Sequence, residues 1–118
     1  MEGGSGYDTL IGGLGNDSFV FTSTSGRITD FVAGTDQLLF ENAVFTGLGT
    51  PSDWAAGDGR FRAAAGTTAA ADADDRLIYN PTNGNLYYDS DGAGGAGSQL
   101  VTTLTNLPGL TAADISVM

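Results

Sequence analysis

Two tandem nine-residue segments, Gly3–Ile11 (GGSGYDTLI) and Gly12–Val20 (GGLGNDSFV), decide the fold that we expect for this chain. Both fit the pattern G-G-x-G-x-D-x-U-x, in which U is a large apolar residue (Leu10, Phe19). Glycine adopts backbone angles that are closed to other residues, so it lets peptide carbonyls turn inward around a small concavity. The aspartate at the sixth position adds a carboxylate, and calcium takes oxygen ligands of these two kinds. The alternative is a pair of glycine-rich turns in an ordinary β-protein, but two copies in register favour a calcium-binding repeat.

The repeat length predicts how the loops stack. Two nonapeptides make one turn of a parallel β-roll, so each loop lies on the loop eighteen positions later. From Gly12 this step leads to residues 30–36 (DFVAGTD), a degenerate loop with two carboxylates and a glycine. We predict one well-formed calcium site near Asp17 and a weaker one near Asp8, because no loop precedes Gly3 in this sequence. The predicted metal ligands are Gly4, Gly6, Asp8, Gly13, Gly15, Asp17, Asp30 and Asp36.

The charge of the chain excludes some partners and favours others. Its 118 residues hold 14 acidic and four basic side chains, all four arginine, which gives a formal charge of −10. Nucleic-acid binding needs a basic face, so we expect none. Charge of this size strains a compact state by self-repulsion, which bound divalent cations would relieve. Part of the acidity is also an ordinary soluble surface.

The composition argues against catalysis. The chain contains no histidine, cysteine or lysine. Catalysis that depends on a histidine or cysteine is therefore excluded, and zinc hydrolysis is disfavoured. Aspartate pairs can cleave glycosides, but the candidates lie in Ala- and Gly-rich loops without an aromatic sugar platform. We expect no enzyme activity from these candidates, Asp72, Asp74, Asp75, Asp89 and Asp91.

No apolar run is long enough to span a bilayer, so we expect no membrane insertion. No amino-terminal signal peptide is visible, and the first repeat begins almost at once. We therefore expect that the sequence belongs to a longer repeat array. Without cysteine the chain has no disulfide framework, and a bound metal would be the staple of a small secreted domain.

Downstream of the repeats the sequence predicts short strands and no long helix. The clearest unit is a hairpin of residues 76–79 and 85–88 around the turn Asn80–Gly84, whose Pro and Asn-Gly are turn residues. Alternating apolar and polar residues, or β-prone runs, predict the other strands. These lie at residues 18–21, 27–31, 37–41, 60–62, 99–107 and 115–118.

Three smaller expectations concern individual residues. In the strand 99–107 we expect Leu100, Leu104 and Leu107 to be the buried anchors. Thr50 or Ser52 is a candidate cap for one helical turn, and Thr111–Asp114 reads as a capped single turn. Five aromatic residues are expected in the core rather than in a ligand platform: Trp54, Phe61, Tyr79, Tyr87 and Tyr88.

The segment Asp89-x-Asp91-Gly92 resembles the start of an EF-hand loop, but the later bidentate glutamate is missing. One interpretation is a simple Asp-rich turn. The other is a second, weaker calcium site at Asp89 and Asp91, helped by Asp74 or Asp75. The sequence leaves both open.

These features together resemble the carboxy-terminal region of bacterial RTX (repeats-in-toxin) proteins, and in particular the carboxy-terminal domain of serralysin-like proteases. The nonapeptides carry the first part of the resemblance. The second is the segment 19–40, with Phe-Val-Phe followed by Ile-Thr-Asp-Phe-x-x-Gly-x-Asp. The third comprises residues 74–79, 86–92 and 110–115.

The resemblance implies an all-β fold in a single domain, 1–118. Residues 1–41 would form the β-roll repeats and closing strands, and residues 42–118 an antiparallel, β-sandwich-like secretion region. It also implies a module that folds on calcium after export, with an uncleaved secretion signal ending at residues 114–118. The implied partners are a type I secretion apparatus and an upstream passenger domain of the parent protein, and the implied location is extracellular. The alternative function is a calcium-dependent binding or adhesion module that contacts a carbohydrate or a surface. We expect a monomer.

Overall fold

The described part of the chain is all-β, as predicted. The computed structural model describes residues 9–11, 13, 15–21, 26–45, 48, 52–54, 58, 60–64, 75–89 and 99–118. The strands are β1 (Thr9–Leu10), β2 (Ser18–Phe21), β3 (Arg27–Ile28), β4 (Gln37–Phe40), β5 (Ser52–Asp53), β6 (Phe61–Ala63), β7 (Leu77–Asn80), β8 (Asn85–Tyr88), β9 (Gln99–Leu104) and β10 (Ile115–Val117). A single 3-10 turn, η1, spans Ala112–Asp114. No helix among the described residues has the length and apolar character needed to cross a membrane.

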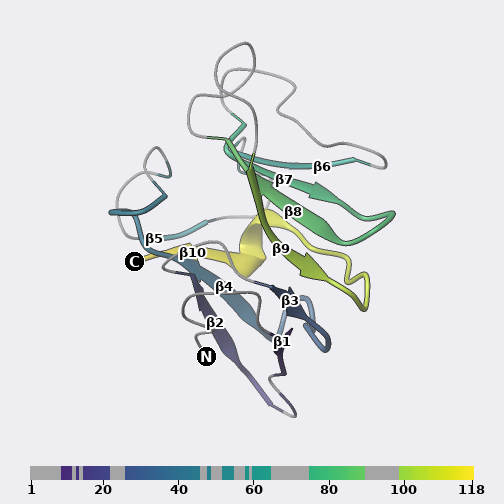
Figure 1. Ribbon diagram of the computed structural model, residues 1–118. Coiled ribbons are helices and arrows are strands. Elements are labelled where there is room, and N and C mark those ends of the chain that lie inside the picture. Colours follow the sequence, from purple (N-terminus) through teal and green to yellow (C-terminus); the bar gives the residue numbers. More distant parts are fainter. Residues whose placement is uncertain are drawn as a thin grey trace.

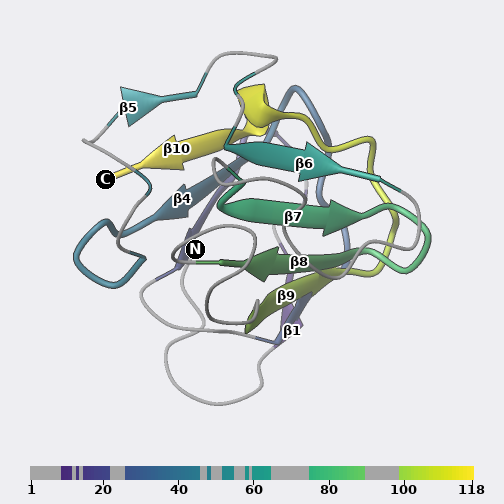
Figure 2. The same ribbon diagram turned by 90° about the horizontal axis from the view of Figure 1, so that it is seen from above.

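The strands form two sheets with the hydrophobic core between them (Figure 1). The larger sheet has the order β1-β3-β9-β8-β7-β6, and the smaller one has the order β2-β4-β10-β5. From above, β6, β7, β8 and β9 lie side by side in one layer, and β4 and β10 lie in the other (Figure 2). Both sheets therefore combine strands from the repeat segment with strands from the rest of the chain.

The amino-terminal strands pair in parallel, with nearly the predicted spacing. Thr9 of β1 pairs with Arg27 of β3, eighteen positions later, as predicted. Ser18 of β2 pairs with Gln37 of β4, nineteen positions later, so the prediction is wrong by one for this pair. The reason is that the segment joining β3 to β4 is one residue longer than the segment joining β1 to β2.

The carboxy-terminal strands extend this parallel arrangement, which was not predicted. β9 pairs in parallel with β3, and β10 pairs in parallel with β4. β6 and β7 are also parallel, so the expected antiparallel pattern holds for β7-β8-β9 and for β5-β10 but not for the whole segment 42–118. The parallel pairing has a physical reason: β9 and β10 satisfy backbone groups that β3 and β4 would otherwise leave open at a sheet edge.

The predicted hairpin is confirmed. Leu77 pairs with Tyr88 and Tyr79 with Leu86 in antiparallel register. Gly84 ends the turn with φ +80°, a conformation that favours glycine, and its amide donates to the Asn80 carbonyl at 2.8 Å. The Gly84 carbonyl in turn accepts from the Leu104 amide at 2.7 Å, so the turn is fastened to the end of β9.

The predicted anchors of β9 are only partly correct. Leu104 is buried, but Leu100 is 42% exposed and Leu107 is 48% exposed. The register between β8 and β9 shifts near Leu86, where Thr102 and Leu100 pair with consecutive residues and Val101 is skipped. Such a bulge reverses which face the following residues occupy, so Val101 is buried in place of Leu100. Leu107 lies beyond the strand, with φ 53°.

The expected helical turn before Trp54 is also wrong. Ser52 and Asp53 form β5, which pairs antiparallel with β10. The Trp54 amide then donates to the Ile115 carbonyl at 3.0 Å. Because the backbone hydrogen bonds of this segment go to a neighbouring strand, no helical turn forms.

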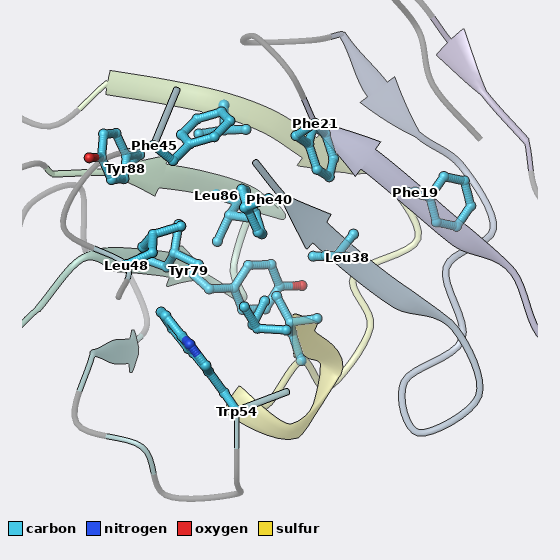
Figure 3. Close-up of a cluster of buried hydrophobic side chains, with 14 of the residues drawn as sticks. Phe19, Phe21, Leu38, Phe40, Phe45, Leu48, Trp54, Tyr79, Leu86 and Tyr88 are labelled. Atoms are coloured by element: carbon cyan, nitrogen blue, oxygen red, sulfur yellow. The ribbon is translucent and has the colours of Figure 1, made fainter. Parts of the chain in front are cut away.

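Aromatic rings join the two sheets across the core (Figure 3). Phe21 stacks on Phe40 at 5.1 Å, Phe40 contacts Phe45 edge to face at 5.2 Å, and Phe45 contacts Tyr88 of the larger sheet in the same way. The predicted burial is confirmed for Trp54, Tyr79 and Tyr88, and Phe61 packs against this core while partly exposed; Tyr87 is only half-buried. The Tyr79 hydroxyl donates to the Pro108 carbonyl at 2.8 Å, which satisfies the one polar atom of that ring.

One ion pair fastens the segment before β6. The Arg60 guanidinium lies 4.2 Å above the Trp54 ring and donates from Nε and Nη2 to the two carboxylate oxygens of Asp58, at 2.9 and 2.6 Å. It also donates to the Leu48 carbonyl. A two-pronged pair stacked on an aromatic ring is a geometry that arginine makes and lysine does not.

Substitution of Gly84 tests the close approach of the turn to β9. In Gly84→Ala the new Cβ meets the Leu104 carbonyl oxygen at 2.1 Å, and alanine is also strained at φ +80°. We expect a loss of at least about 2 kcal/mol in the free energy of unfolding, since the left-handed backbone alone costs roughly 1–2 kcal/mol. Gly109→Ala is the matched control, because a Cβ there meets nothing within 4 Å. Equal urea midpoints for the two variants would contradict this account.

The ion pair makes a testable contribution to acid stability. Hydrogen bonding from Arg60 lowers the pKa of Asp58 below 3.8, so folding favours the ionised carboxylate. Its contribution is present above the unfolded pKa and is lost as the pH falls through the folded one. Asp58→Asn should cost about 1 kcal/mol or less at neutral pH. Urea unfolding at several pH values should show this difference shrinking below pH 3.8; a pH-independent difference would argue against the assignment.

Candidate metal centre

Three loops lead from a strand of the larger sheet to the next strand, which lies in the smaller sheet. Loop A (residues 11–17) joins β1 to β2, loop B (residues 29–36) joins β3 to β4, and loop C (residues 105–114) joins β9 to β10. The strands on both sides of each loop pair in parallel with those of the next, so the loops are stacked in the order A, B, C. Figure 1 shows β3 between β1 and β9, and β4 between β2 and β10.

Loops A and B meet through residues that the sequence singled out. The Gly13 amide donates to Oδ2 of Asp30 at 2.7 Å. The Asp17 amide donates to Oδ1 of Asp36 at 2.9 Å, and the Asp17 carbonyl accepts from the Gln37 amide at 2.8 Å. The structure thus brings together the two predicted halves of the candidate site.

Glycines with positive φ determine the backbone conformation at the turns of both loops. Gly15 and Gly34 have φ of 88° and 82°, and each lies two residues before an aspartate, Asp17 or Asp36. Gly13 has φ 81°. A Cβ at any of the three meets nothing within 4 Å, so glycine is needed here for the backbone conformation and not for space.

The two equivalent aspartates differ in how their carboxylates are used. Asp36 is fully buried, with Oδ1 accepting from the Asp17 amide and Oδ2 from the Val32 amide, both at 2.9 Å. Oδ2 of Asp17 is buried as well, but no group of the described structure donates a hydrogen bond to it. A buried carboxylate oxygen without a partner costs free energy, roughly 1–3 kcal/mol or more when it is charged. Oδ2 of Asp17 is therefore available to bind a cation or to accept a hydrogen bond.

The residues of loops A and B fit a calcium ion by ligand type. The orphaned Asp17 oxygen and the carbonyls of glycine-rich turns are hard oxygen ligands, which calcium prefers. Within the described residues, however, no three acidic side chains come together in a group that could hold a metal. Asp17 offers an oxygen that no described group bonds, whereas each oxygen of Asp36 already accepts one backbone amide.

The other predicted ligands have separate outcomes. Asp30 and Asp36 support the loops through amide contacts. Asp89 is buried at the end of β8, where its amide donates to the Arg76 carbonyl at 2.8 Å, away from the segments that form the three loops. The remaining candidates, Gly4, Gly6, Asp8, Asp72, Asp74 and Asp91, lie outside the described residues.

Sequence reasoning missed the part played by loop C. It assigned Asp114 to a capped turn, and this is correct: Oδ2 accepts from the Thr111 amide at 3.0 Å. But Oδ1 accepts from the Gly34 amide of loop B at 2.7 Å. Asn106 adds a second link by donating from Nδ2 to the Phe31 carbonyl at 2.8 Å. The spacing Thr-x-x-Asp signals a cap, but nothing local signals a contact with a residue 80 positions away.

Comparison of the chain with protein-family models, with curated proteins and with solved structures finds no match in any of the three.

Proposed function

We propose that this chain is a calcium-dependent folding module, in which loops A and B are successive loops of a short parallel β-roll. The observation that carries the proposal is the buried, unpartnered Oδ2 of Asp17 beside turns made by Gly13, Gly15 and Gly34. No described group donates a hydrogen bond to this oxygen. An ion bound there would neutralise it and join the two loops.

The pairing of the strands supports the roll. Two nonapeptides per turn require parallel strands eighteen positions apart, which β1 and β3 show, and β2 and β4 differ from this step by one residue. Phe19, at the apolar position of the second nonapeptide, is fully buried, as that arrangement requires. The extra residue of loop B raises the separation between paired residues from eighteen to nineteen. It does not turn the side chains of β4 to the opposite face of the sheet, because β3 and β4 both keep their parallel partners.

The charge of the chain supports a switch between loose and folded states. With a formal charge of −10, the chain repels itself when no cation is bound. An ion that binds only the folded state adds roughly 2.7 kcal/mol of stability at a hundredfold excess over its dissociation constant. Extracellular calcium modules bind at about 10⁻⁴ to 10⁻³ M, so such a site would be empty inside a cell and filled outside it.

This behaviour suits a protein that is exported unfolded and folds outside. We place the module at the carboxy-terminal end of a secreted protein that leaves through a type I apparatus, with its activity in an upstream passenger domain. Its own residues perform binding and folding, and we assign them no catalytic step.

A calcium titration tests the proposal. Far-UV circular dichroism and tryptophan fluorescence, which reports on buried Trp54, should both change between chelator and millimolar calcium. Asp17→Asn should raise the calcium concentration at the midpoint at least about tenfold, since loss of a charged ligand costs over 1.4 kcal/mol. Glu41→Gln is the control, because it removes the same charge outside loops A and B.

Two results would reject the proposal. One is wild-type protein whose spectra are identical in chelator and in calcium. The other is equal midpoints for Asp17→Asn and Glu41→Gln, which would mean that calcium acts only by screening the net charge.

A further inference from the structure

We infer that Asp114 is a positioning residue for the candidate metal centre: it holds loop B from the carboxy-terminal side, and so makes cation binding and docking of the turn η1 depend on each other. The inference rests on the proposed function, and it adds a residue that belongs to none of the repeats.

The first step is the geometry of Asp114 itself. Its side chain is buried, and its two carboxylate oxygens accept from the Gly34 amide at 2.7 Å and the Thr111 amide at 3.0 Å. Both oxygens face peptide N–H groups, so Asp114 has no oxygen left unbonded for a cation. It acts on loop B through the backbone of Gly34.

The second step is the place of Gly34 in the site. Gly34 has the left-handed conformation that turns loop B toward Asp36, two residues later. Asp36 in turn accepts from the Asp17 amide, and Asp17 carries the unpartnered oxygen. Two hydrogen bonds and the short backbone segment from Gly34 to Asp36 therefore connect the carboxy-terminal turn with Asp17, whose oxygen would meet the cation.

The third step is that loop C holds loop B at more than one point. Asn106 donates to the Phe31 carbonyl at 2.8 Å, and Gln37 donates from Nε2 to the Ala113 carbonyl at 3.1 Å. β10 continues the contact by pairing with β4. Among these contacts the Asp114 bond is the one that involves a carboxylate, and hydrogen bonds to a charged group are worth about twice as much as neutral ones.

Coupling of this kind is reciprocal. If Asp114 favours the calcium-binding conformation of loop B, then bound calcium must also favour the docked position of η1. Loss of the Asp114 contact should therefore weaken calcium retention even though the residue itself touches no cation.

The test compares the full-length chain with Asp114→Asn, Asp114→Ala and the matched control Val117→Ala. Val117 is buried in β10, the strand that follows η1, and pairs with Phe40, outside loop B. Two quantities are measured in calcium-saturated protein: the rate at which calcium is released to a fluorescent chelator, and the exchange rate of the Gly34 amide proton by NMR. The free energy of unfolding is also measured for each variant, so that release and exchange rates are compared between variants that lose similar amounts of stability.

We expect Asp114→Asn to release calcium at least about fivefold faster than wild type, within the usual range of coupling between sites. Asp114→Ala, which removes both acceptors, should release it faster still, and the Gly34 amide should lose protection in both. Val117→Ala should change neither quantity by more than about twofold, because it weakens packing without touching loop B.

Each alternative result has a distinct meaning. If wild type and Val117→Ala bind calcium and the Asp114 variants release it no faster than Val117→Ala, then Asp114 is only a cap and the inference is wrong. If wild type shows no calcium binding at all, the proposed function fails and the inference fails with it.

Discussion

Hydrogen bonds from loop amides to aspartate carboxylates are the interaction on which this structure depends. Where the loops stack, peptide N–H groups of one loop face the next loop, and each such group needs an acceptor once it is buried. Asp30 supplies one for Gly13, Asp36 one for Asp17 and Asp114 one for Gly34. A hydrogen bond to a charged acceptor contributes about 1.5–3 kcal/mol. Part of the chain's acidity is therefore structural, since these carboxylates bind one loop to the next.

The same stacking constrains the lengths of the loops. Paired strand positions are nine residues apart across loop A, ten across loop B and eleven across loop C. Because the strands on both sides stay in register, each added residue must be accommodated inside its loop. Loop B turns at Gly34 in a left-handed conformation, and loop C forms the 3-10 turn η1. The parallel pairing therefore tolerates growth of the loops, but only where the backbone can make a tight turn.

Local signals in the sequence predicted the local parts of the fold. The hairpin around Asn80–Gly84, the strand of residues 18–21 and the eighteen-residue step between β1 and β3 all follow from turn residues or repeats. The parallel pairing of β9 with β3 joins residues 76 positions apart, and no periodic pattern in the sequence indicates it. The bulge at Val101 likewise depends on β8 as a neighbour and reverses the face of Leu100. The same holds for the candidate site. The repeat motif and its spacing identify Asp17 and Asp36, but only the stacking of the loops determines that Asp17 is the one with an oxygen that no described group bonds.

Loop C meets loop B through a carboxylate, Asp114, and not through glycine turns like those of loops A and B. Gly109, the one glycine of loop C, does not have the positive φ of Gly13, Gly15 and Gly34, so this loop lacks left-handed glycine turns. It instead offers loop B a carboxylate, Asp114, whose two oxygens each accept a hydrogen bond from a backbone amide. The junction of loops B and C is thus balanced by the protein's own donors, while the junction of loops A and B contains an excess carboxylate oxygen. Among the described loops, the first junction therefore holds a carboxylate oxygen that no described group bonds, whereas both oxygens of Asp114 at the second junction accept a backbone amide.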